Sequence, residues 1–204
     1  MTKLRVALLF GGRSSEHSIS CATAAGVLAA IDRTRFEVIP IGITLAGQFV
    51  PAVDDSEKWA LGKGQLATVE FEGELIELAL DGSRELTRVS ESGERQSLGA
   101  VDVIFPVLHG PFGEDGTIQG FLELGNYPYV GNGVFASAAA IDKEFTKALL
   151  QAANVPVTPH LVVTKFQWLD DPESTLERVR ELGKGPYFVK PARAGSSVGV
   201  SKVK

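Results

Sequence analysis

The first part of the chain alternates between apolar runs and breaks that are rich in glycine and polar residues. Residues 4–10 (LRVALLF) form an apolar run that is typical of a strand buried in a parallel sheet. Small apolar residues recur at helical spacing over residues 18–31, with Ser18 as the expected N-cap. A second apolar run follows at residues 36–44. This strand–helix–strand order predicts a parallel sheet.

The pattern changes after the second predicted strand. Residues 45–98 are rich in Gly, Glu and Ser, and their apolar stretches are short. We therefore predict a peripheral insertion with short antiparallel strands. A longer apolar run returns at residues 101–110 (VDVIFPVLHG) and predicts another buried strand. A helix is expected to follow over residues 117–125 (TIQGFLELG).

The remaining residues predict shorter elements. In chain order these are a short strand at 127–131, a helix at 142–153 with Asp142 as N-cap, an extended segment at 155–164, a helix at 172–183, a buried strand at 186–190, a glycine-rich turn at 191–199 and a strand beginning at 200–203. A two-stranded hairpin with helices on one side is a poor independent core. We therefore expect a first domain of about residues 1–130 and an incomplete second domain at 131–204, in the front part of a longer protein.

Composition and charge exclude several classes of protein. The formal net charge is −5 over 204 residues, so the chain lacks the overall basic character of a nucleic-acid-binding domain. Its one cysteine, Cys21, cannot form an internal disulfide and fits a reducing compartment. The longest apolar runs are too short for a membrane span, and the N-terminus lacks a signal-peptide cleavage pattern. We expect a cytoplasmic protein.

Candidate chemistry gathers at the predicted carboxyl ends of two strands. The turn after the first strand reads GGRSSE, which is not the dinucleotide-binding pattern, and no P-loop motif is present. Glu16 lies in this turn, at the edge where ligands of parallel sheets usually bind. A carboxylate there would repel phosphate but suit an ammonium group. His109 ends the strand at residues 101–110 and is expected at the same edge.

Two acidic residues precede the helix expected from residue 117. Acids at a helix N-terminus are stabilised by the helix dipole and cap free N–H groups, and this capping role is the favoured interpretation of Asp115. Glu114 is the candidate support for His109. The three histidines have no ligand-like spacing with Cys21, so a zinc site is not favoured.

Two lysines occupy positions at which the expected local structure makes a lysine unfavourable. Lys143 opens the helix expected from residue 142, where a cation opposes the helix dipole. Lys190 ends a predicted buried strand and precedes the turn ARAGSSVG, whose glycines and hydroxyls could surround phosphate oxygens. The alternative is a pair of solvated lysines beside an ordinary hairpin turn. Lys190 beside the turn favours phosphate binding.

Four motifs together resemble one family. FGGRSSEHSIS, VLHGPFGEDGTIQG, DKEFTK and FVKPARAGSSVGVSKV are similar to D-alanine–D-alanine ligases, which are ATP-grasp enzymes of bacterial cell-wall (peptidoglycan) synthesis. The resemblance implies a Rossmann-like parallel-sheet N-terminal domain, or pre-ATP-grasp domain, followed by the start of an ATP-grasp central subdomain. The insertion at residues 45–98 is the part that matches least closely.

The resemblance also implies roles for individual residues. Glu16 would hold the ammonium group of the first D-alanine, His109 would line its pocket, and Glu114 would support this substrate-binding part. Ser196 would join Glu16 as a catalytic residue, in a hydrogen-bonded set with a tyrosine from a later loop. The residues implied in ATP binding are Lys143, Lys190, Gly195, Ser196, Ser197 and Val198.

The implied reaction is ATP-dependent joining of two D-alanine molecules through an acyl phosphate. ATP and Mg²⁺ are the implied cofactors, with Mn²⁺ as an alternative, and the metal ligands are expected outside this chain. A homodimer is implied, with no nucleic-acid or membrane partner. The 204-residue chain alone is expected to form no dipeptide.

Two other functions stay open on the sequence alone. One is a related ATP-grasp ligase, such as a D-alanine–D-lactate ligase, because the discriminating loop lies outside the chain. The other is a non-catalytic ligand-binding or dimerisation module, which predicts that Lys143, Lys190 and Ser196 are scattered and solvated. The ligase hypothesis predicts instead that both lysine side chains converge on one cleft with the turn at residues 193–199. It also places Glu16 and His109 at the edge of the facing domain.

Overall fold

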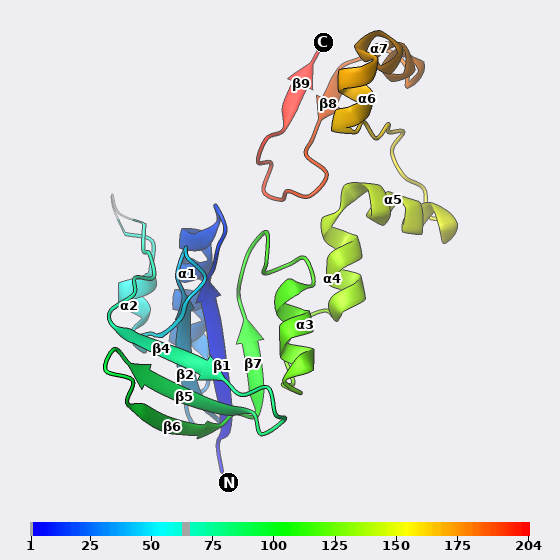
Figure 1. Ribbon diagram of the computed structural model, residues 1–204. Helices are drawn as coiled ribbons and strands as arrows, with labels where there is room; N and C mark the ends of the chain where they lie inside the picture. Colours follow the sequence, from blue (N-terminus) through cyan, green and yellow to red (C-terminus); the bar gives the residue numbers. More distant parts are fainter. Residues whose placement is uncertain (1, 63–65) are drawn as a thin grey trace. The chain divides into compact units, whose positions relative to one another are not determined.

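The computed structural model describes residues 2–62 and 66–204, which fall into two compact units (Figure 1). The first unit ends at Ala138 and the second spans Ala139–Lys204. Each unit has its own sheet and helices.

A four-stranded sheet is the centre of the first unit. Its strands are β1 (Leu4–Gly11), β2 (Phe36–Ile43), β3 (Phe49–Pro51) and β7 (Val103–Pro106), in the order β3-β2-β1-β7. β1 pairs in parallel with both β2 and β7, whereas β3 is antiparallel to β2. The predicted parallel sheet is confirmed. The carboxyl ends of β1 and β7 therefore lie at the same edge.

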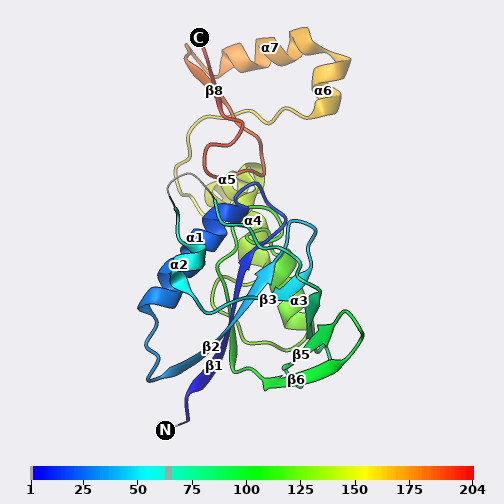
Figure 2. The ribbon, with the colours of Figure 1, turned by 90° about the vertical axis from the view of Figure 1, so that its left-hand side faces the viewer.

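The helices of this unit are α1 (His17–Ala30), the short α2 (Ser56–Trp59) and α3 (Thr117–Leu124). Figure 2 shows α1 and α2 on one side of strands β1 and β2, with α3, β5 and β6 on the other. Ser18 lies inside α1, so the prediction that it is the N-cap was wrong. The Ser14 carbonyl already accepts the His17 N–H at 3.2 Å, and this tight turn starts the helix earlier.

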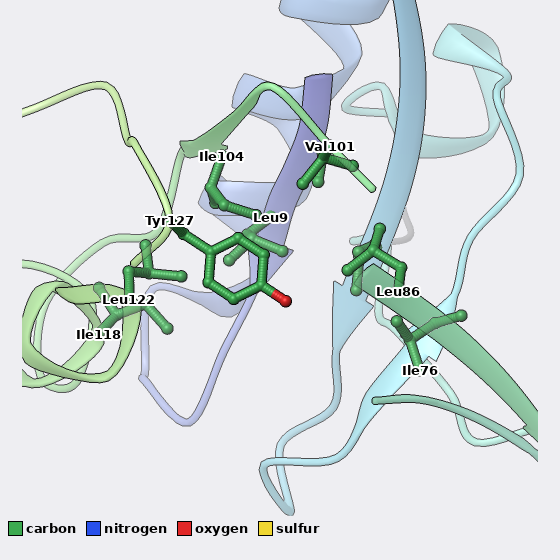
Figure 3. Packing of buried hydrophobic residues seen from close by; sticks show 10 residues of the cluster. Leu9, Ile76, Leu86, Val101, Ile104, Ile118, Leu122 and Tyr127 are labelled. Atoms are coloured by element: carbon green, nitrogen blue, oxygen red, sulfur yellow. The ribbon is translucent and has the colours of Figure 1, made fainter. Parts of the chain in front are cut away.

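Alternate residues of β1 pack into two different hydrophobic cores, because successive side chains of a strand point to opposite faces of the sheet. Ala7 and Leu9 belong to a cluster that includes Leu122 of α3, and Figure 3 shows Leu9 near Ile104 and Tyr127 in this cluster. The neighbouring residues of β1 belong to the second cluster, together with Cys21, Ala24 and Leu28 of α1. Burial raises the pKa of the Cys21 thiol to about 11. Both faces of β1 are therefore covered, which explains its continuous apolar sequence.

The insertion forms a second, antiparallel sheet. Its strands are β4 (Glu74–Leu78), β5 (Glu85–Ser90) and β6 (Arg95–Ala100), which confirms the predicted short antiparallel strands. Its predicted peripheral position is wrong. Leu86 is fully buried in the first core, and Trp59 and Val69 are buried in the second. The insertion is part of the packing of the first unit.

The second unit contains most of the remaining elements. They are α4 (Val134–Ile141), which begins in the first unit, then α5 (Lys143–Ala152), α6 (Lys165–Asp170), α7 (Pro172–Glu181), β8 (Tyr187–Val189) and β9 (Ser201–Val203). Asp142 accepts a hydrogen bond from Glu144 N and confirms the predicted cap of α5. α4 and α6 were not predicted.

Two strand predictions differ from the structure. Residues 127–131 form no strand; a single bridge pairs Tyr129 with Ile104. β8 was predicted to be buried, but Phe188 and Val189 are 57% and 59% exposed. The reason is that β8 belongs to a two-stranded sheet, in which it pairs with β9.

Candidate active-site elements in the two units

Glu16 and His109 come from loops at the same edge of the first sheet. Glu16 follows β1, and its N–H donates to Ser14 Oγ at 3.0 Å. A Cβ added at Gly110 would lie 2.8 Å from both Glu16 Oε2 and Ser14 Oγ. The Glu16 carboxylate therefore lies against the residue that follows His109. Gly110 has a φ of +71° and cannot be replaced without strain at this close approach.

His109 is oriented by a residue of α1. Its Nε2 lies 3.0 Å from Thr23 Oγ1, and the Thr23 hydroxyl donates to Ile19 O at 3.0 Å. Because the hydroxyl has one proton, this geometry favours Nε2–H of His109 as the donor to Thr23. In the neutral imidazole, Nδ1 is then left as an acceptor.

The acidic pair after His109 holds the loop that leads into α3. Glu114 Oε2 accepts a hydrogen bond from Gly110 N at 2.7 Å, so Glu114 supports the backbone beside His109. Asp115 accepts from Phe112 N at 2.9 Å and from Thr117 N, in the first turn of α3, at 3.0 Å. It therefore satisfies a free N–H group at the start of the helix, but the N-cap residue itself is Gly116, which makes no side-chain cap bond. Partial burial opposes ionisation of Asp115, but the hydrogen bonds from Phe112 and Thr117 outweigh it and lower the pKa of this carboxyl.

An apolar cavity of about 210 Å³ lies on the α3 side of the same loops. His109 lines it together with Gly12, Arg13 and Phe121, whereas Glu16 is not among its lining residues. The Arg13 guanidinium lies over the Phe112 ring, 5.0 Å from its centre. His109 thus lines this apolar cavity and also contacts Thr23 of α1.

Ser20 joins the ends of the two strands that carry these loops. Its hydroxyl accepts from Gly11 N at 2.9 Å and donates to Val107 O at 2.7 Å. The residue is fully buried. Neither Ser20 nor Thr23 was predicted to belong to the site, because a small polar residue within a run of small apolar residues gives no signal of its long-range partner.

In the second unit, Lys143 lies against the glycine-rich turn. Its backbone N–H donates to Ala192 O at 3.0 Å, and its Nζ donates to the carbonyls of Ala192 and Ala194. The turn contains consecutive left-handed residues, with φ of 49° at Ser196 and 60° at Ser197. A Cβ added at Gly195 would meet no atom within 4 Å, so the backbone there is open to a ligand.

Lys190 lies one residue beyond β8 and is exposed. Among the described residues, no carboxylate lies within 4.0 Å of its ammonium group. Lys143 therefore contacts the turn through hydrogen bonds, whereas Lys190 is near the turn only because it directly precedes it in the sequence.

Asp142 ties the start of α5 to the same turn. It is 4% exposed, and its Oδ2 accepts from Arg193 Nε at 2.7 Å. The hydrogen bond from Arg193 lowers the pKa of Asp142 despite partial desolvation. The cap and the ion pair together fix Lys143 and residues 191–199 within one local structure.

Replacing Asp142 with Ala is expected to destabilise this local structure, because it removes the N-cap of α5 and the partner of Arg193. Loss of a cap costs about 1 kcal/mol. Because the folded pKa is lowered, the contribution of Asp142 is present above the usual carboxyl pKa of 3.8 and is lost as the pH falls below it, through the folded pKa. Hydrogen exchange of the Glu144 amide measures the effect. Asp142→Asn, which keeps a capping oxygen, should retain more protection; equal loss in both variants would contradict the capping argument.

Across residues 2–62 and 66–204, no three His, Cys, Asp or Glu side chains are grouped so that they could hold a metal ion. Within the same ranges, no helix has the length and apolar character needed to cross a membrane.

Comparison with known proteins identifies the family. Residues 5–132 match the family model described as D-ala D-ala ligase N-terminus. The chain belongs to the D-alanine–D-alanine ligase family. Residues 149–204 match a second model of this family, described as D-ala D-ala ligase C-terminus. The resemblance drawn from the four motifs is confirmed, as is the α/β fold with its parallel N-terminal sheet followed by the start of a further domain.

Curated relatives and solved structures of the family cover nearly all of this chain. A D-alanine–D-alanine ligase of Arthrobacter sp. is 54% identical over 202 residues, which are 98% of this chain and 53% of the relative. The structure of the D-alanine–D-alanine ligase from Coxiella burnetii is 31% identical with a TM-score of 0.76, over 99% of this chain and 57% of that one. The VanG D-Ala:D-Ser ligase from Enterococcus faecalis is 29% identical with a TM-score of 0.77, over 98% and 55%. The chain thus spans about half the length of the curated relatives that it matches.

Proposed function

We propose that this chain supplies the N-terminal half of an ATP-dependent D-alanine–D-alanine ligase that acts in the cytoplasm in peptidoglycan precursor synthesis. The observation that carries the proposal is the placement of the Glu16 carboxylate beside Gly110, next to His109, at the carboxyl edge of the parallel sheet. The curated relatives bear the name of this activity.

In this proposal, residues 1–130 form the D-alanine side of the enzyme. Glu16 holds the ammonium group of the first D-alanine, because an anionic oxygen at the sheet edge attracts a cation and repels phosphate. His109, next to Gly110, forms part of the same substrate site, and Glu114 fixes the backbone beside it. Positioning the substrate in this way is itself a large part of catalysis of group transfer.

Residues 131–204 form the ATP-phosphate side. Lys143 and Lys190 contribute positive charge, and Gly195, Ser196, Ser197 and Val198 contribute N–H groups and hydroxyls. Ser196 is also assigned a catalytic role by the family resemblance. The residues fit a polyphosphate, because the turn combines left-handed backbone at Ser196 and Ser197 with open space at Gly195.

ATP supplies the phosphoryl group that activates the carboxylate of the first D-alanine, and the amine of the second then attacks. The described residues offer no group of three metal ligands. We therefore assign the Mg²⁺ ligands, and the remaining groups that stabilise the transferred phosphoryl, to the part of the relatives' length that this chain does not span. A homodimer and an alternative use of Mn²⁺ belong to the same proposal.

A chimera tests the proposal directly. We expect that replacing the matching half of the Arthrobacter relative with residues 1–204 gives a protein that releases ADP when D-alanine is present and forms D-alanyl-D-alanine. The 204-residue chain alone should form no dipeptide. A folded chimera without D-alanine-dependent ADP release would contradict the proposal, as would activity of the chain alone. Offering D-lactate or D-serine with D-alanine shows whether a related ligase activity is the better assignment, a question raised by the likeness to a D-Ala:D-Ser ligase.

A further inference from the structure

His17 makes two buried hydrogen bonds, one with each ring nitrogen. Its Nδ1 lies 2.8 Å from Gly12 O, and its Nε2 lies 2.9 Å from Val69 N. A carbonyl oxygen can only accept and a backbone N–H can only donate. The ring must therefore donate from Nδ1 and accept at Nε2, which is the neutral Nδ1–H tautomer. The side chain is 3% exposed, so water does not substitute for either partner.

The two partners of His17 belong to distant parts of the first unit. Gly12 lies in the loop between β1 and Glu16. Val69 lies in the insertion, between α2 and β4, and is 3% exposed. Val69 also packs closely against the ends of two strands: a Cβ added at Gly42 would lie 2.5 Å from Val69 Cγ1, and one at Gly11 would lie 3.0 Å from Val69 Cγ2. Through Val69, the insertion thus packs against the carboxyl ends of β1 and β2.

The loop that carries Glu16 is held from two sides. Ser20 binds Gly11 N and ties it to β7 through Val107 O. His17 binds Gly12 O and ties it to the insertion through Val69 N. In the sequence, Glu16 lies between Gly12 and His17, and so within the segment that both contacts close. It is the N-cap residue of α1, but its side chain makes no cap hydrogen bond. Its carboxylate can therefore face Gly110 instead of the helix end.

We propose that His17 is a positioning residue, and that the insertion at residues 45–98 acts through it to set the place of Glu16 in the substrate site. This inference rests on the proposed function, in which Glu16 holds the first D-alanine. A function for the insertion follows: it supplies the donor at Val69 that fixes the tautomer and the orientation of His17.

A purely stabilising role of His17 predicts a different outcome. In that case a variant that still folds would bind D-alanine normally. If His17 positions Glu16, a folded variant binds D-alanine more weakly while ATP binding is unchanged, because the ATP-phosphate residues belong to the other unit.

Two amide variants separate the two hydrogen bonds. His17→Asn can donate to Gly12 O but does not reach Val69 N, whereas His17→Gln can accept from Val69 N but not bind Gly12 O in the same way. In the chimera, both are expected to raise KM for D-alanine by about 3- to 30-fold, with kcat and KM for ATP little changed. His160→Asn is the matched control, because His160 lies in the second unit, outside this contact. An unchanged KM for D-alanine in folded His17 variants would overturn the proposal.

The tautomer is measured on the 204-residue chain itself, so this measurement does not depend on the proposed activity. Long-range ¹H–¹⁵N correlation spectra of the ring should show the proton of His17 on Nδ1, in contrast to the Nε2–H form that is common in water. A proton on Nε2 would overturn the inference. If the chimera forms no dipeptide while the Nδ1–H signal is present, the proposed function is wrong, and the positioning role of His17 in D-alanine binding is wrong with it. The contact between His17 and the insertion is then still confirmed.

Discussion

Replacing Glu16 with Gln is expected to raise KM for D-alanine by about 10- to 100-fold in the chimera. A hydrogen bond that involves a charged group contributes about 1.5–3 kcal/mol, and each 1.4 kcal/mol changes binding tenfold. Gln has nearly the same shape, so it keeps the close approach to Gly110 and removes only the negative charge that, in the proposed function, binds the ammonium group of D-alanine. Steady-state kinetics with D-alanine measure the effect, and the melting temperature shows whether the fold is kept.

The matched control is Glu72→Gln, which makes the same change of charge at an exposed position before β4. It should leave KM for D-alanine unchanged. A further discrimination comes from D-lactate, which has a hydroxyl in place of the ammonium group. Glu16→Gln should weaken binding of D-alanine much more than binding of D-lactate in the first position. Equal losses for both compounds would show that Glu16 does not recognise the ammonium group.

The parallel sheet and the helix after β1 could be predicted because their signals are local. The apolar run of β1 reflects its two covered faces, and the glycines that follow mark its end. α6 also had a local signal that was missed: Thr164 and Gln167 form a capping box, with Thr164 Oγ1 accepting from Gln167 N at 3.2 Å. α4 has no such polar start, since its first three residues, Val134, Phe135 and Ala136, are apolar.

Contacts between distant residues could not be predicted in this way. His17 and Val69 are 52 positions apart, and Asp142 and Arg193 are 51 positions apart. Nothing in a single sequence indicates which buried donor an imidazole will meet. For the same reason the insertion was expected to be peripheral, although Val69 closes the end of the sheet beside the candidate substrate loop.

The lysines of the second unit give the other large expected effect. Lys143→Met and Lys190→Met should each lower kcat/KM for ATP by about 10- to 100-fold in the chimera, because under the proposed function each removes a positive charge that binds phosphate. Their mechanisms differ. Lys143 Nζ also donates to Ala192 O and Ala194 O, so its loss should loosen the turn and speed amide exchange at Ser196 and Ser197.

Lys190 has no such structural contact among the described residues, so its replacement should leave the turn intact and act through charge alone. Added salt should therefore reduce the difference between Lys190→Met and the unmodified chimera, because ions screen an exposed charge. Lys184→Met, in the exposed segment before β8, is the control and should leave KM for ATP unchanged. If all three lysine variants bind ATP equally well, the turn at residues 191–199 is an ordinary hairpin turn, and the non-catalytic module becomes the better account of the chain.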